Sequence, residues 1–164
     1  HVLFVLGIFL LAVRPRPVLW QVTAFTLAHT ITLALTIYGV VSLPSSIVEP
    51  LIALSIVYVA IENVFTDRLH AWRPLVVFGS GLLHGMGFAG VLSEIGLPRS
   101  EFVPALLAFN VGVELGQLTV IFTAFLIVGL PFREKPWYRR RVVVPGSLAI
   151  AAVGLYWFVQ RVFF

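Results

Sequence analysis

The chain has 164 residues, a mean hydropathy of +1.04, and a composition of 60% hydrophobic and 11% charged residues. So apolar a composition excludes an ordinary soluble domain of this size and predicts an integral membrane protein. The formal net charge of +4 does not indicate nucleic-acid binding, because the basic residues lie in short stretches between apolar runs, as membrane orientation signals do.

Six apolar runs, separated by prolines and charged residues, predict six transmembrane helices. We expect them at residues 1–13, 18–41, 47–65, 74–92, 102–130 and 142–164. Because the connections are short, the second and third helices are expected to be antiparallel neighbours. The predicted fold class is an all-α polytopic transmembrane bundle, with residues 1–164 in a single transmembrane domain.

The first run is short for a membrane span, and it begins at His1 without an initiator methionine or the charged leader of a signal peptide. We therefore expect the chain to be a fragment truncated at its N-terminus. The missing upstream segment is expected to complete the first helix and to be extracytoplasmic.

Basic residues are distributed unevenly between the two ends of the predicted bundle. When the loops alternate across the membrane, Arg99 and Arg161 lie on one side and the other nine Lys and Arg residues on the opposite side. The positive-inside rule makes the second side cytoplasmic. We therefore expect a multi-pass protein of a bacterial-type inner membrane, with both ends of this chain extracytoplasmic. The nine residues are Arg14, Arg16, Arg68, Arg73, Arg133, Lys135, Arg139, Arg140 and Arg141.

The fifth predicted helix carries polar side chains near its centre. On a helix, Asn110, Glu114 and Gln117 fall within about 60° of one another, while Gly112 and Gly116 fall on the opposite side. The polar face is expected to line a pathway, and the glycine face to permit close helix packing. An ionisable group in hydrocarbon costs at least roughly 2.5–3.5 kcal/mol, so Glu114 must have a partner, a water or an ion.

Four polar residues are expected at one depth, because His29, Ser55, His84 and Glu114 each lie near the centre of a predicted helix. If their faces converge, His29, His84 and Glu114 meet around one ion. Imidazole with carboxylate suits Zn, Ni, Co or Fe, and the absence of cysteine excludes thiolate ligands. His1, near the outer end of the first helix, is either a further metal ligand or an exposed end.

Other polar residues extend this column toward both surfaces. Glu62 lies about 10 Å from Ser55 toward the cytoplasmic end, and Asn63 follows it. Glu49 is expected near the outer surface, where it either attracts cations or belongs to a solvated rim. The resulting path would run past Glu49 to the imidazoles and leave past Glu62 and Asn63.

Three glycines, Gly85, Gly87 and Gly90, follow His84 within six residues. So many glycines are unusual inside a helix. Either another helix approaches closely at this point, or the helix is locally broken and exposes carbonyl oxygens to an ion. The sequence leaves both interpretations open.

Five segments together resemble the HupE/UreJ family of membrane proteins, which is associated with nickel or cobalt uptake for hydrogenase and urease. The segments are residues 1–6, 25–33, 48–63, 83–89 and 109–117, and the resemblance covers essentially the whole chain. It is to the subgroup in which an exported N-terminal region precedes the membrane part. In this family a His-rich signature ending in Asp-His opens the first helix, and His1 matches its last residue. Better-studied nickel permeases of the family have a second His and a Glu soon after the His-Gly of the fourth helix, where this chain has residues 86–89.

We predict a permease for a divalent transition metal, with Ni or Co as substrate and Zn as another candidate. Transport is favoured over enzymatic activity because no His-Glu-x-x-His motif is present. One alternative is an intramembrane zinc-dependent hydrolase in which Glu114 or Glu62 is the base. Another is a non-transporting membrane subunit with a structural polar core. The expected partners are the lipid bilayer, the metal ion and, in a homo-oligomer, a second copy of the chain.

Overall fold

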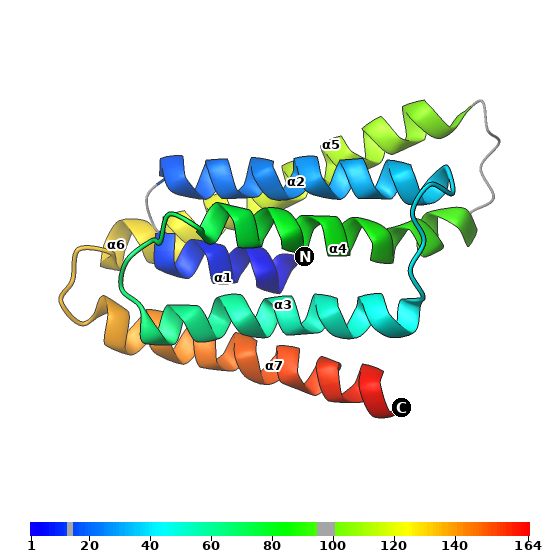
Figure 1. Ribbon diagram of the computed structural model, residues 1–164. Helices are drawn as coiled ribbons and strands as arrows, with labels where there is room; N and C mark the ends of the chain where they lie inside the picture. Colours follow the sequence, from blue (N-terminus) through cyan, green and yellow to red (C-terminus); the bar gives the residue numbers. More distant parts are fainter. Residues whose placement is uncertain (13–14, 95–100) are drawn as a thin grey trace.

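The computed structural model describes residues 1–12, 15–94 and 101–164, and every regular element in these ranges is a helix (Figure 1). Two π-helices extend neighbouring α-helices, so that η2 joins α5 to α6 and η3 leads into α7. The described residues thus form six helical rods, which confirms the predicted all-α bundle. The elements are α1 (Val2–Ala12), α2 (Pro15–Ile37), α3 (Ser45–Phe65), α4 (Arg73–Glu94), α5 (Phe102–Ala124), η2 (Phe125–Gly129), α6 (Leu130–Phe132), η3 (Arg139–Val143) and α7 (Val144–Phe163).

Four helical stretches among the described residues are long and apolar enough to cross a membrane. They are Arg16–Ile37, Ser45–Phe65, Val103–Phe132 and Arg139–Phe163. Helix α1 is apolar but shorter, and α4 is not among the four although it has 22 residues. Helix α4 packs against α2 and α3, so protein covers part of its surface in place of lipid. The chain is a membrane protein.

The second helix begins earlier and ends earlier than the sequence predicts. Pro15 and Pro17 lie in its first turn, where backbone N–H groups have no intrahelical partner and proline therefore costs nothing. The helix ends at Ile37 because Gly39 adopts a φ of 72°, which only glycine reaches easily. The Gly39 N–H donates to the carbonyl of Thr36 at 3.0 Å in the final turn.

The prolines of the last two rods each follow a π-helical turn. Pro131 follows η2 and the rod ends at Phe132, close to the predicted boundary, whereas Pro145 follows η3 and lies within the last rod. A proline has no N–H for the carbonyl four residues earlier, and its ring clashes with that carbonyl. The π-helical turn before each proline accommodates this, because its hydrogen bonds span five residues.

The order of packing differs from the order of the chain. Helix α2 lies along α4, α3 lies along α7, and α1 contacts α2, α3, α5 and α7 (Figure 1). The prediction that the second and third helices are neighbours was wrong, because α2 and α3 run in opposite directions but do not pack along each other. Helix α2 packs on α4 instead, because α4 allows the two backbones to approach closely.

That approach depends on Gly81 and Gly85 of α4. A Cβ at Gly81 would lie 2.5 Å from the carbonyl oxygen of Phe25, and a Cβ at Gly85 would overlap the carbonyl oxygen of His29. Helix α4 continues through these glycines to Glu94. Close packing is therefore the correct interpretation, and a broken helix at this point was the wrong one.

The glycines of α5 are different. A Cβ at Gly112 or Gly116 would have nothing within 4 Å among the described residues. The sequence predicts close packing on this face, and no described helix provides it.

A matched pair of substitutions tests the α2–α4 contact. Gly85→Ala should lower the free energy of unfolding by about 1–3 kcal/mol, because the new methyl group meets backbone. Gly112→Ala should be neutral or stabilising by up to about 1 kcal/mol, since alanine favours helix and the space is open. Thermal unfolding in detergent measures both. Equal losses of stability would contradict the close approach.

Candidate functional site

Three imidazoles lie together at the middle of the bundle, and we call His1, His29 and His84 the imidazole cluster. The Nε2 atom of His1 lies 3.4 Å from Nδ1 of His29. The ring centroid of His1 is 5.0 Å from that of His29 and 4.9 Å from that of His84. His29 is 0% and His84 is 1% exposed. Three residues from α2, α4 and the start of α1 thus share one buried space.

The depth of His1 differs from its expected place near the outer end of the first helix. Helix α1 has 11 residues and is about 16 Å long, half the thickness of a bilayer core. Its N-terminal end lies beside the middle of α4 (Figure 1). His1 therefore reaches the depth of His29 and His84.

Aromatic rings enclose the imidazole cluster. Phe25 and Phe109 stack on His29 with centroid distances of 6.1 and 6.3 Å. Phe88 lies 4.7 Å from the ring of His1, and Phe4 lies 5.4 Å from that of His84. These rings give the cluster apolar surroundings, in which an ion must lose its water and bind protein atoms instead.

Ser55 brings α3 to the cluster, as its predicted depth requires. Its Oγ lies 3.3 Å from Nε2 of His84 and donates its proton to the carbonyl of Ile52 at 2.7 Å. The tautomer of His84 decides which of the two groups donates in this contact. The contact orients His84.

Two buried nitrogens near the cluster have no hydrogen-bond partner among the described residues. They are Nε2 of His29 and Nε2 of Gln117. His1 and Gln117 also line a cavity of about 180 Å³ between α1 and α5. An unsatisfied buried polar group costs about 1–3 kcal/mol, so these atoms are suited to receive a bound molecule or ion.

A second polar set joins α2 to α5, and we call it the threonine seam. Three threonines of α2 each contact a polar side chain of α5 through Oγ1, near the middle of the membrane span. The pairs are Thr23 with Glu114 at 3.3 Å, Thr26 with Gln117 at 3.2 Å, and Thr30 with Asn110 at 2.8 Å. The three polar residues predicted on one face of the fifth helix thus face α2 together.

The expected meeting of Glu114 with His29 and His84 is not formed. Glu114 is half-buried and bonds to Thr23, which lies six residues before His29 and therefore about 240° around α2. No group of three or more His, Asp or Glu side chains in residues 1–12, 15–94 and 101–164 is arranged to hold a metal ion. Helix α2 has two polar faces, one with Thr23 toward Glu114 and one with His29 toward the imidazole cluster. The sequence pattern predicted them as one face.

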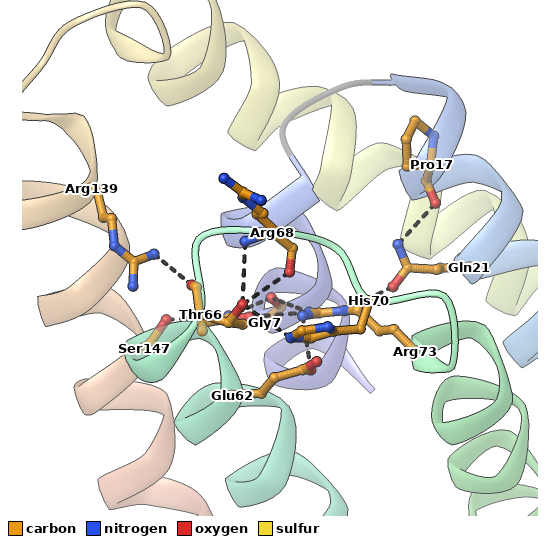
Figure 2. A network of polar contacts seen from close by, with 11 residues as sticks. Gly7, Pro17, Gln21, Glu62, Thr66, Arg68, His70, Arg73, Arg139 and Ser147 are labelled. Carbon is orange, nitrogen blue, oxygen red and sulfur yellow. Dashed lines mark hydrogen bonds and ion pairs between the residues drawn. The ribbon is translucent and has the colours of Figure 1, made fainter.

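A third polar set surrounds Arg73, the first residue of α4, and we call it the arginine hub (Figure 2). The sequence assigns Arg73 to a cytoplasmic loop, but its side chain is 1% exposed. Nη1 forms an ion pair with Oε2 of Glu62 at 2.9 Å, and Nη2 donates to Oδ1 of Asn63 at 3.1 Å. The predicted path past Glu62 and Asn63 is therefore filled by a guanidinium group.

The arginine hub also reaches three other helices. Nε of Arg73 donates to Oε1 of Gln21 at 3.0 Å, and Nη2 lies 3.5 Å from the carbonyl oxygen of Gly7. Asn63 donates to the same carbonyl at 2.7 Å and to Oγ of Ser147 at 3.3 Å. Four helices, α1 to α4, thus meet at this one cation, and Asn63 connects it to α7 through Ser147. Gln21 and Ser147 were not predicted as site residues. The one sequence signal for them is that each is a polar residue within an apolar run.

The protein family follows from a comparison of the whole chain. A family model described as "HupE / UreJ protein" matches residues 1–161. The chain belongs to the HupE/UreJ family. A search of the curated proteins found no match, and neither did a search of the solved structures.

The two ends of this HupE/UreJ protein carry different charges. Glu49 pairs with Arg161 at 3.0 Å in a surface hollow of about 400 Å³ between α3 and α7. At the opposite end, Arg139 donates to the carbonyls of Thr66 and Val64 at the end of α3, where the helix dipole favours a cation. Arg14 and Arg99, which the predicted orientation uses, lie outside the described residues.

Proposed function

We propose that this HupE/UreJ protein is a permease for a divalent transition metal of the nickel or cobalt type. The imidazole cluster carries the proposal, because it brings three imidazole side chains together at mid-depth and leaves a buried nitrogen of His29 without a partner among the described residues. The three rings are close but are not arranged around one point, so binding an ion requires them to turn. Imidazole is a preferred ligand of Ni, Co and Zn. The family is associated with nickel and cobalt uptake, which supports the same substrate class.

The composition of the imidazole cluster suits passage better than permanent binding. In the described part of the chain no carboxylate bonds to its three imidazoles, and its surroundings are aromatic. A conducting site must bind an ion well enough to admit it and weakly enough to release it. The membrane potential supplies ~2.3 kcal/mol per charge per 100 mV, or roughly 4.6 kcal/mol for a divalent cation. No phosphate-binding loop motif is present in the sequence, so this energy is the source that we assign.

The threonine seam gives the structural alternative a specific basis. Each of its α5 side chains has a partner on α2, as in a polar contact that only specifies helix packing. Glu114 therefore has two roles to distinguish, an electrostatic one for the ion and a hydrogen-bonding one for the helices.

The role of the imidazoles is tested by three matched substitutions. His29→Gln and His84→Gln should each reduce nickel uptake by proteoliposomes about tenfold or more, because a lost ligand costs at least ~1.4 kcal/mol of binding. His70→Gln is the control, since His70 is exposed and stacks on Trp72 outside the cluster. Uptake that falls equally in all three variants, or in none, would refute the proposed site.

Glu114 is tested by separating its charge from its hydrogen bond. Glu114→Gln removes the charge and keeps an acceptor for Thr23, whereas Thr23→Val keeps the charge and removes the donor. If the carboxylate serves the ion, uptake should collapse in Glu114→Gln and survive in Thr23→Val. If the pair is only structural, Glu114→Gln should transport normally, and Thr23→Val should melt at a lower temperature.

The orientation is tested with tags. The connections α3–α4 and α6–η3 lie at one end of the bundle (Figure 1). Seven of the eleven basic residues lie in these two connections or directly beside them, namely Arg68, Arg73, Arg133, Lys135, Arg139, Arg140 and Arg141. We assign this end to the cytoplasm of a bacterial-type cell. A tag after Phe164 should be labelled from outside intact cells, and a tag after the exposed Lys135 should not. The reverse pattern would invert the direction of the path.

A further inference from the structure

The oxygen atoms around Arg73 form a set of ligands typical of a cation site. The guanidinium is bound by the carboxylate of Glu62, the side-chain oxygens of Gln21 and Asn63, and the backbone carbonyl of Gly7 (Figure 2). Carboxylate and carbonyl oxygens are what hard divalent cations take as ligands. In this structure the cation is part of the protein.

Only one of the two oxygens of the Glu62 carboxylate is bonded among the described residues. Oε2 is paired with Arg73, while Oε1 is buried and has no hydrogen-bond partner among the described residues. The Glu62 side chain is 8% exposed. Arginine and carboxylate often pair through two parallel bonds. The single bond leaves an oxygen that a second cation could contact while Arg73 is still in place.

The arginine hub lies in line with the imidazole cluster. Arg73 and His84 are eleven residues apart on α4, which is three turns, so they lie on the same face about 16 Å apart. Between them, Val77 is 0% and Ser80 is 4% exposed. The hub therefore closes the α3–α4 end of the same column.

We propose that Arg73 is a tethered cation that occupies a divalent-cation site and that a permeating ion displaces it from Glu62. This inference rests on the proposed function for the identity of the ion. While Arg73 is bound, its fixed positive charge repels an arriving cation and fills the path. When Glu62 exchanges the guanidinium for the ion, the charge of the carboxylate remains compensated and the end of the column opens.

The test is cation-dependent melting of the purified full chain, which does not require transport. Arg73→Gln frees the oxygen ligands and should lower the melting temperature, and millimolar nickel or calcium should then raise it by several degrees. Wild type should show a much smaller rise, because the added cation has to displace the guanidinium from Glu62. Arg73→Gln combined with Glu62→Gln should recover stability and lose the cation response. The matched control is Arg139→Gln, which frees only backbone carbonyls.

A second variant keeps the test decisive if Arg73→Gln does not fold. Arg73→Lys retains a tethered charge with fewer donors, so added cation should compete with it and raise the melting temperature by a smaller amount. No cation response in any folded Arg73 variant would overturn the inference and leave the hub as a structural ion pair. Failure of nickel uptake by wild type would refute the proposed function alone, since melting does not depend on it.

Discussion

The close approach of α2 to α4 is the constraint on which the rest of the bundle depends. Because Gly81 and Gly85 have no side chain, the backbone of α4 lies against the carbonyl oxygens of Phe25 and His29. The same contact lets Thr32 of α2 donate to the carbonyl of Leu82 at 2.7 Å. It brings His29 and His84 into one space and excludes α3 from the position beside α2. Without this contact the imidazoles would have no common site.

Polar groups in an apolar bundle have to be satisfied, and this chain does so in three distinct ways. The threonine seam pairs hydroxyls with carboxylate and amide groups. The arginine hub balances a buried cation with one carboxylate and three neutral oxygens, and losing either charged partner of such a pair typically costs about 3–5 kcal/mol. The imidazole cluster combines convergent nitrogens with a buried one that has no partner among the described residues.

The two carboxylates of these polar sets, Glu114 and Glu62, have different partners. Glu114 and Glu62 are both carboxylates within helices of this membrane protein, yet only Glu62 is neutralised by a basic side chain of the chain itself. Glu114 has a hydroxyl as its partner and is half-buried. A cation in the imidazole cluster would therefore have an uncompensated carboxylate on a neighbouring helix and a compensated one at the closed end.

The sequence by itself determined what depends on local chemistry. Apolar runs long enough for a bilayer predicted the all-helical bundle, and mid-run positions predicted that His29, Ser55 and His84 share a depth, since helical rise is fixed at about 1.5 Å per residue. The pattern of Asn110, Glu114 and Gln117 predicted a common face for the same reason. Only the tertiary structure decided which faces meet. The rotation of each helix and the helix that it packs against depend on side-chain shape over whole interfaces. The spacing of residues in the sequence does not encode this shape. For that reason Glu114 turned toward Thr23, His1 reached the centre of the bundle, and Arg73, expected in a loop, became the cation at which four helices join.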